Sequence, residues 1–116
     1  MRDHTKLNAF RLADGLVLGV YRVTRRFPTE ERYGLAAQLR RAAVSIAANI
    51  VEGSARTTEG EYLRFLTIAL GSARELEYEL SLSRRLGYIA DRELESIASK
   101  TSRALWALIS HFKRQH

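Results

Sequence analysis

Arginine is the residue type whose number and spacing in this chain best fit a binding chemistry. Of the 19 cationic residues 16 are arginine, and the formal net charge is +6. The first 28 residues hold six basic and two acidic groups. Read as a helix, this segment places four arginines on one side: Arg11, Arg22, Arg25 and Arg26. Guanidinium groups bind phosphate through paired hydrogen bonds, so we expect this side to bind nucleic acid. The alternative is a solvated basic face that keeps an oligomer soluble.

The aromatic residues do not form an evident stacking surface for unpaired bases. Tyr21, Tyr62 and Phe65 lie at spacings typical of a helix core, and Tyr33 and Tyr88 lie in connections. Proteins that bind single strands stack successive bases on aromatic side chains. We therefore expect RNA or DNA to be bound through phosphate groups and shape, without base specificity.

A second set of polar residues follows one narrow stripe of the helix expected around residues 38–53. The stripe consists of Gln38, Arg41, Ser45, Asn49 and Glu52. Helical spacing places a matching set along one edge of a later helix: Ser72, Glu75 and Glu79. We expect a structural hydrogen-bond network between the two helices, in which Arg41 pairs with Glu75 or Glu79. Such a partly buried pair fixes register more than it adds stability.

Motifs of the common enzyme classes are missing from the sequence. It has no cysteine, and no P-loop, dinucleotide-binding glycine pattern, nucleophile elbow or zinc-protease helix. Its histidines, His4, His111 and His116, lie near the two ends of the chain, where we do not expect an organised acid–base or metal site. We therefore predict a non-enzymatic protein with no catalytic residues, no cofactor and no metal.

Four helical segments must position these residues. Pro28 is the single proline and glycines are scattered, so strand and hairpin signals are nearly absent. We expect the first helix over about residues 6–26 and the second from about residue 35 to residue 52 or 54. The third begins at a capping box formed by Thr58 and Glu61 and ends at about Gly87, and the fourth follows Asp91. The third helix has one long apolar stripe: Tyr62, Phe65, Leu66, Ala69, Ala73, Leu76 and Leu80. Short connections predict one all-α domain over residues 1–116, an antiparallel up-down-up-down four-helix bundle.

Burying one stripe from each helix leaves further apolar residues without a partner. A contiguous apolar patch of this kind is typical of a protein interface. We therefore expect a homo-oligomer whose interface contains these residues together with one arginine: Leu12, Leu16, Val23, Phe27, Arg40, Val44, Val51 and Trp106. The alternative is a looser bundle that covers them internally.

The composition is that of an ordinary globular protein, with 46% hydrophobic and 28% charged residues. The segment MRDHTKLNAF lacks the apolar run of a signal peptide. The apolar run over residues 12–21 contains Asp14 and is too short to cross a bilayer. The absence of cysteine favours the interior of a cell. We expect a cytoplasmic protein with no membrane partner.

Most of the chain resembles a known family. The stretches FPTEERYGLAAQLRRAAVSIAANIVEG and EYLRFLTIALGSARELEYEL are similar to the 23S rRNA intervening-sequence proteins, or S23 family. The resemblance extends from FRLADGLVLGVY through LGYI. The family motif falls on Gln38, Arg41, Ser45, Ile46, Asn49, Glu52, Gly53, Gly71, Ser72 and Glu75.

The resemblance implies an antiparallel four-helix bundle that assembles as a ring-shaped homopentamer. It also implies a relation to accessory proteins of diversity-generating retroelements, which bind nucleic acid through basic surface, and no enzymatic activity. From residues and resemblance together, we expect an oligomeric bundle that binds RNA or DNA. The alternative is a protein-interaction scaffold or accessory subunit that has a protein partner and no direct contact with nucleic acid.

Overall fold

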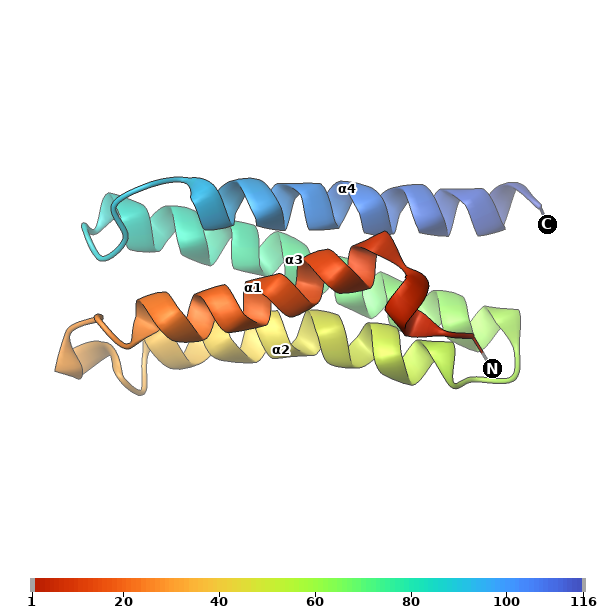
Figure 1. Ribbon diagram of the computed structural model, residues 1–116, viewed down its shortest axis with the longest axis horizontal. Helices are drawn as coiled ribbons and strands as arrows, with labels where there is room; N and C mark the ends of the chain where they lie inside the picture. Colours follow the sequence, from red (N-terminus) through yellow and green to blue (C-terminus); the bar gives the residue numbers. More distant parts are fainter. Residues whose placement is uncertain (1, 116) are drawn as a thin grey trace.

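Four long helices form the protein in a computed structural model that describes residues 2–115 (Figure 1). With two short 3-10 turns, the elements are η1 (His4–Lys6), α1 (Asn8–Thr24), η2 (Thr29–Glu31), α2 (Leu35–Ser54), α3 (Glu59–Arg85) and α4 (Glu93–Arg114). Each long helix packs on the next, and α4 packs back on α1. Consecutive helices run in opposite directions along a body of 46 × 20 × 20 Å. The predicted all-α antiparallel bundle is confirmed.

The α1–α2 and α3–α4 connections meet at one end of the bundle, which we call the connection end (Figure 1). Both chain termini and the α2–α3 turn lie at the opposite end. α1 ends at Thr24, three residues before Phe27, for which the following Pro28 disfavours helical conformation. α2 begins at Leu35, whose N–H donates to Oε1 of Glu31 at 3.1 Å. The predicted start of this helix is confirmed.

Both ends of α3 follow local sequence signals. Oγ1 of Thr58 accepts a hydrogen bond from the N–H of Glu61 at 3.2 Å, as the capping box predicts. At the other end Gly87 has a φ of +85°, in the left-handed region that favours glycine. The N–H of Tyr88 then donates to the carbonyl oxygen of Ser83 at 2.8 Å and closes the helix end.

The hydrophobic core contains the predicted stripe of α3 in full. All seven of its residues are buried: Tyr62, Phe65, Leu66, Ala69, Ala73, Leu76 and Leu80. The other helices contribute fully buried side chains that include Leu16, Leu39, Ile46 and Leu105. Burial of apolar surface stabilises a fold by about 25 cal/mol per Å², so these contacts hold the four helices together. Over residues 2–115, no helix is long and apolar enough to cross a membrane.

Gly53, near the end of α2, allows this helix to lie close against α3. A Cβ atom on Gly53 would lie 2.8 Å from Cβ of Phe65 and 3.4 Å from the carbonyl oxygen of Tyr62. Because protein interiors are close-packed, a side chain at this position would push the two helices apart. The glycine therefore serves the packing of α2 against α3.

Candidate nucleic-acid interface

The four arginines of the predicted nucleic-acid surface do not lie on one stripe. Arg22 and Arg26 line a groove between α1 and the start of α4, together with Asp91 and Glu93. Arg25 instead lines a pocket between α1 and α2. α1 ends at Thr24, so Arg25 and Arg26 belong to the turn that follows the helix rather than to its helical face. The single basic side that the sequence predicted is therefore divided between two faces.

All four of these arginines are exposed, and their charges are not neutralised within the described chain. Within the described residues, the ion pairs join Arg56 to Glu52, Arg74 to Glu77 and Arg84 to Glu95. Arg11, Arg22, Arg25 and Arg26 take part in none of them. Their charge is available to an anionic partner.

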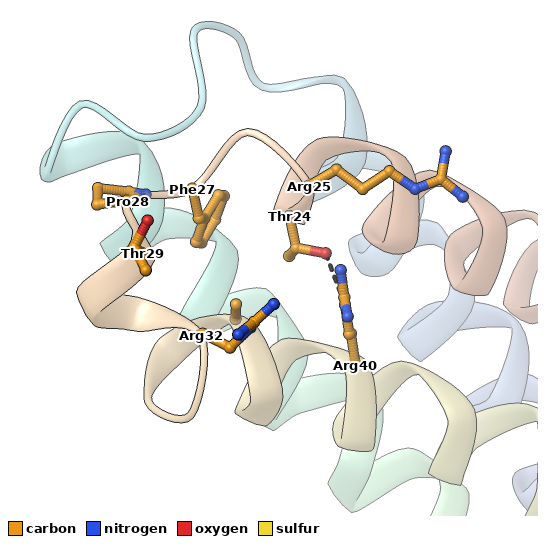
Figure 2. Close-up of a pocket in the computed structure, with 8 residues that line it drawn as sticks. Thr24, Arg25, Phe27, Pro28, Thr29, Arg32 and Arg40 are labelled. Atoms are coloured by element: carbon orange, nitrogen blue, oxygen red, sulfur yellow. Dashed lines mark hydrogen bonds between the residues drawn. The ribbon is translucent and has the colours of Figure 1, made fainter.

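A pocket of about 360 Å³ at the connection end gathers three arginines from α1, the connection and α2 (Figure 2). Its lining consists of Thr24, Arg25, Phe27, Pro28, Thr29, Arg32, Ala36 and Arg40. Arg32 was missed in the sequence because it belongs to no helical stripe. Its place in a short connection that directly follows the arginines of α1 is the signal that could have found it.

Arg40, which was predicted for an oligomer interface, has partners within its own chain. Its Nε donates to Oγ1 of Thr24 at 2.8 Å, and its guanidinium lies 4.7 Å from the ring centroid of Tyr21. Tyr21, which the helical spacing assigned to the core, is exposed beside it. Arg40 therefore links α2 to α1 within the chain.

The predicted polar network joins α2 to α3 through three residues. The hydroxyl oxygens of Ser45 and Ser72 lie 2.8 Å apart, which is a hydrogen bond between the two helices. Nδ2 of Asn49 donates to the carbonyl oxygen of Ser45 at 2.8 Å and to its hydroxyl at 3.1 Å. Glu52 pairs with Arg56, four residues further along the chain. Gln38 is exposed near the start of α2.

Arg41 does not form the predicted ion pair with Glu75 or Glu79. Its side chain is exposed, and no ion pair within residues 2–115 includes it. Glu79 is only 4% exposed, and its Oε1 is buried without a hydrogen-bond partner in the described chain. Burial raises the pKa of Glu79 to about 7; the neighbouring Glu75 carboxyl adds to this rise, and the charge of Arg41 opposes it. Glu79 is therefore partly protonated at neutral pH.

The apolar residues predicted for an oligomer interface fall into two groups. Leu16 is fully buried and Phe27 is buried with its ring 5.2 Å from that of Tyr88, so the prediction is wrong for these two. Leu12 and Val23 are half-buried. The reason is that α1 contacts both α2 and α4, which together cover a wider face of α1 than one stripe.

Val44, Val51 and Trp106 remain exposed, by 41%, 38% and 59% respectively. Val44 lies in a shallow depression with Tyr21, and we call Tyr21, Val44 and Val51 the α2 patch. Trp106 lies in another depression with Leu70, and we call these two residues the α4 patch. In the described chain α2 and α4 do not contact each other. The α2 patch also includes Tyr21 of α1, and the α4 patch also includes Leu70 of α3.

The described histidines lie against phenylalanine rings. His4 is 4.7 Å from Phe10 and His111 is 5.5 Å from Phe112, measured between ring centroids. His116 lies outside the described residues. From Arg2 to Gln115, no group of three or more histidine or acidic side chains is placed to hold a metal ion.

Both the sequence and the fold match known proteins. Residues 5–110 match the 23S rRNA-intervening sequence protein family. A crystal structure of a protein with unknown function from the S23 ribosomal protein family of Bacteroides thetaiotaomicron is similar, with a TM-score of 0.78 and 25% sequence identity. The match covers 88% of this chain and 95% of that one. No curated protein matches the chain. The chain therefore belongs to the 23S rRNA-intervening sequence protein family.

Proposed function

We propose that this protein is a non-enzymatic, oligomeric four-helix bundle that binds RNA or DNA through its basic surface. The observation that supports this proposal is the exposure of the α1 arginines, none of which has an ion-pair partner in the described chain. On a protein of net charge +6, unpaired arginines attract a polyanion. Binding gains further free energy because each neutralised phosphate releases condensed counterions.

Phosphate groups rather than base edges are the proposed contacts. Tyr62 and Phe65 are buried in the core, so their rings are not available to stack on bases. The ring of Tyr21 is already in contact with Arg40. Contacts to phosphate fix position but do not read sequence. We therefore propose binding by charge and shape, without base specificity.

Oligomerisation is proposed from the two apolar patches. If the α2 patch of one subunit packs on the α4 patch of the next, the interface joins two different surfaces. Such heterologous contacts form a ring when the rotation between subunits closes. The homopentamer implied by the family resemblance fits this arrangement, and a ring would repeat the α1 arginines around the assembly. We propose a cytoplasmic location from the absence of cysteine, and an accessory role beside a reverse transcriptase from the resemblance.

A protein-interaction scaffold is the second candidate. It is favoured by the exposure of Trp106, since tryptophan is enriched among the residues that dominate binding energy in protein interfaces. In this case the basic surface would only keep the protein in solution. The two candidates differ in one property that can be measured directly, which is affinity for nucleic acid.

The proposal is tested by removing charge from α1 and comparing binding of a labelled RNA duplex. The variant is Arg22→Gln/Arg26→Gln. The matched control is Arg64→Gln/Arg114→Gln, which removes the same charge from exposed positions at the opposite end of the bundle. We expect weaker binding by the α1 variant, with a log-log salt slope shallower by about 0.9 for each phosphate that the variant no longer neutralises. Equal binding by both variants, with unchanged helical circular dichroism, would remove α1 from the interface.

A further inference from the structure

We propose that the pocket between α1 and α2 at the connection end is a binding site for a single phosphate group. The inference rests on the proposed function, because the phosphate would belong to the bound nucleic acid. The residues that line it include three arginines, Arg25, Arg32 and Arg40, and two threonines, Thr24 and Thr29. No carboxylate is among the described residues that line it. Guanidinium groups recognise phosphate oxygens through charge-assisted hydrogen bonds.

Arg40 is held in place before any ligand binds. The hydroxyl of Thr24 donates its hydrogen to the carbonyl oxygen of Val20 at 2.7 Å, so its oxygen is free to accept from Nε of Arg40 at 2.8 Å. The ring of Tyr21 supports the same guanidinium from one side. Because Nε is occupied by this bond, the terminal nitrogens of Arg40 remain as donors. A side chain fixed in this way loses little conformational entropy when it binds an anion.

The charge of the pocket is not neutralised by the protein. Within residues 2–115, Arg25, Arg32 and Arg40 take part in no ion pair. Glu31 precedes Arg32 in the sequence, but its carboxylate has other partners. Its two oxygens accept hydrogen bonds from the N–H of Leu35 and the hydroxyl of Tyr88. The like charges of Arg32 and Arg40, whose guanidinium groups face the same opening, repel each other, and a bound anion would relieve that repulsion.

The orientation of the side chains suits a phosphate seated between α1 and α2. Figure 2 shows the guanidinium groups of Arg32 and Arg40 turned toward the same opening below Thr24, while Arg25 extends away along α1. Arg32 and Arg40 would therefore make the first contacts, and the exposed Arg25 would fold in afterwards. A volume of about 360 Å³ is many times the ~30 Å³ that one water molecule occupies in the liquid, which leaves room for the group attached to the phosphate.

Two sources could supply this phosphate: a diester in the backbone or a monoester at a 5′ end.

The test compares the wild type, Arg25→Gln/Arg32→Gln and the control Arg64→Gln/Arg114→Gln. The double pocket variant leaves Arg40, which has a structural role, in place. The probe is a short labelled RNA duplex with either a 5′ phosphate or a 5′ hydroxyl. A parallel measurement follows the melting temperature in inorganic phosphate against chloride at equal ionic strength.

We expect the pocket variant to bind the RNA about tenfold more weakly than the wild type, because its amides cannot form charged hydrogen bonds, while the control keeps its affinity. Stronger wild-type binding to the 5′-phosphorylated duplex identifies a terminal monoester, and equal binding identifies a backbone diester. We also expect phosphate to raise the melting temperature of the wild type and of the control, but not of the pocket variant.

The two readouts separate this inference from the proposed function. If the wild type binds RNA and the pocket variant binds it equally well, with no specific stabilisation by phosphate, the pocket inference is overturned and the proposed function stands. If the wild type binds no nucleic acid but phosphate stabilises it in a manner that requires Arg25 and Arg32, the pocket is a phosphate site and the proposed function fails.

Discussion

Glu79 makes folding stability depend on pH in a direction opposite to that of most carboxylates. Its pKa in the folded protein is about 7, against an ordinary value of 4.5, chiefly because the carboxyl group is buried. Between these two values the folded protein keeps the proton and the unfolded chain releases it. The contribution of Glu79 to the free energy of unfolding therefore falls as pH rises from 4.5 to about 7, and this contribution is level on either side of the window.

The magnitude follows from the size of the pKa change. Each pKa unit corresponds to about 1.36 kcal/mol, so Glu79 lowers the free energy of unfolding by roughly 3 kcal/mol across the window. Glu79→Gln removes this titration while keeping the shape of the side chain. The free energy of unfolding of the variant should therefore not show this decrease with pH. Its absolute value also depends on how the amide is accommodated in the buried site.

The assay is urea unfolding followed by circular dichroism at closely spaced pH values and one fixed protein concentration, because oligomerisation links stability to concentration. The quantity of interest is the difference between wild type and variant, in which titrating groups that do not interact with Glu79 cancel. Arg41→Gln provides a second perturbation, since loss of its charge should raise the pKa of Glu79 further and extend the fall to higher pH. Parallel curves for the wild type and Glu79→Gln would refute the reasoning.

Three further predictions concern packing and assembly. Gly53→Ala should destabilise the protein by about 1–3 kcal/mol, because the new Cβ would overlap Phe65 on α3, and chemical denaturation measures this. Gly71→Ala, at an exposed helical position where a Cβ meets nothing within 4 Å, should instead stabilise it by about 0.5–1 kcal/mol; a loss of stability there would contradict the packing argument. Val51→Glu should shift the protein toward monomer in analytical ultracentrifugation. The control Leu86→Glu, at an exposed position outside both patches, should not. A wild type that is already monomeric would rule out the α2 patch as a self-interface.

The helices of this bundle could be predicted from the sequence because their signals are local. The capping box at Thr58, the left-handed Gly87 and the seven-residue stripe of α3 each depend on neighbours within a few turns, and the structure contains all three. The inter-helix contact of Ser45 with Ser72 was also predicted, since both lie on polar edges at helical spacing.

What the sequence did not determine depends on the angle at which helices face each other. Leu16 was assigned to an oligomer interface because only one buried stripe per helix was assumed. In the structure both α2 and α4 cover α1, and Leu16 is buried between helices of the same chain. Arg40 looked like an interface residue because the hydroxyl of Thr24 that accepts its hydrogen bond lies on another helix. Arg32 could be identified as a site residue only from the structure, in which it and Arg40 line the same pocket.

The most direct test of nucleic-acid binding is a titration of the wild-type protein against labelled RNA and DNA duplexes of unrelated sequence at several salt concentrations. Binding through unpaired arginines predicts similar affinities for the different sequences, and log K should fall linearly with log salt concentration by about 0.9 for each phosphate contacted. No binding at low salt, or binding that salt does not weaken, would contradict it and leave a protein partner as the better explanation of the exposed surface.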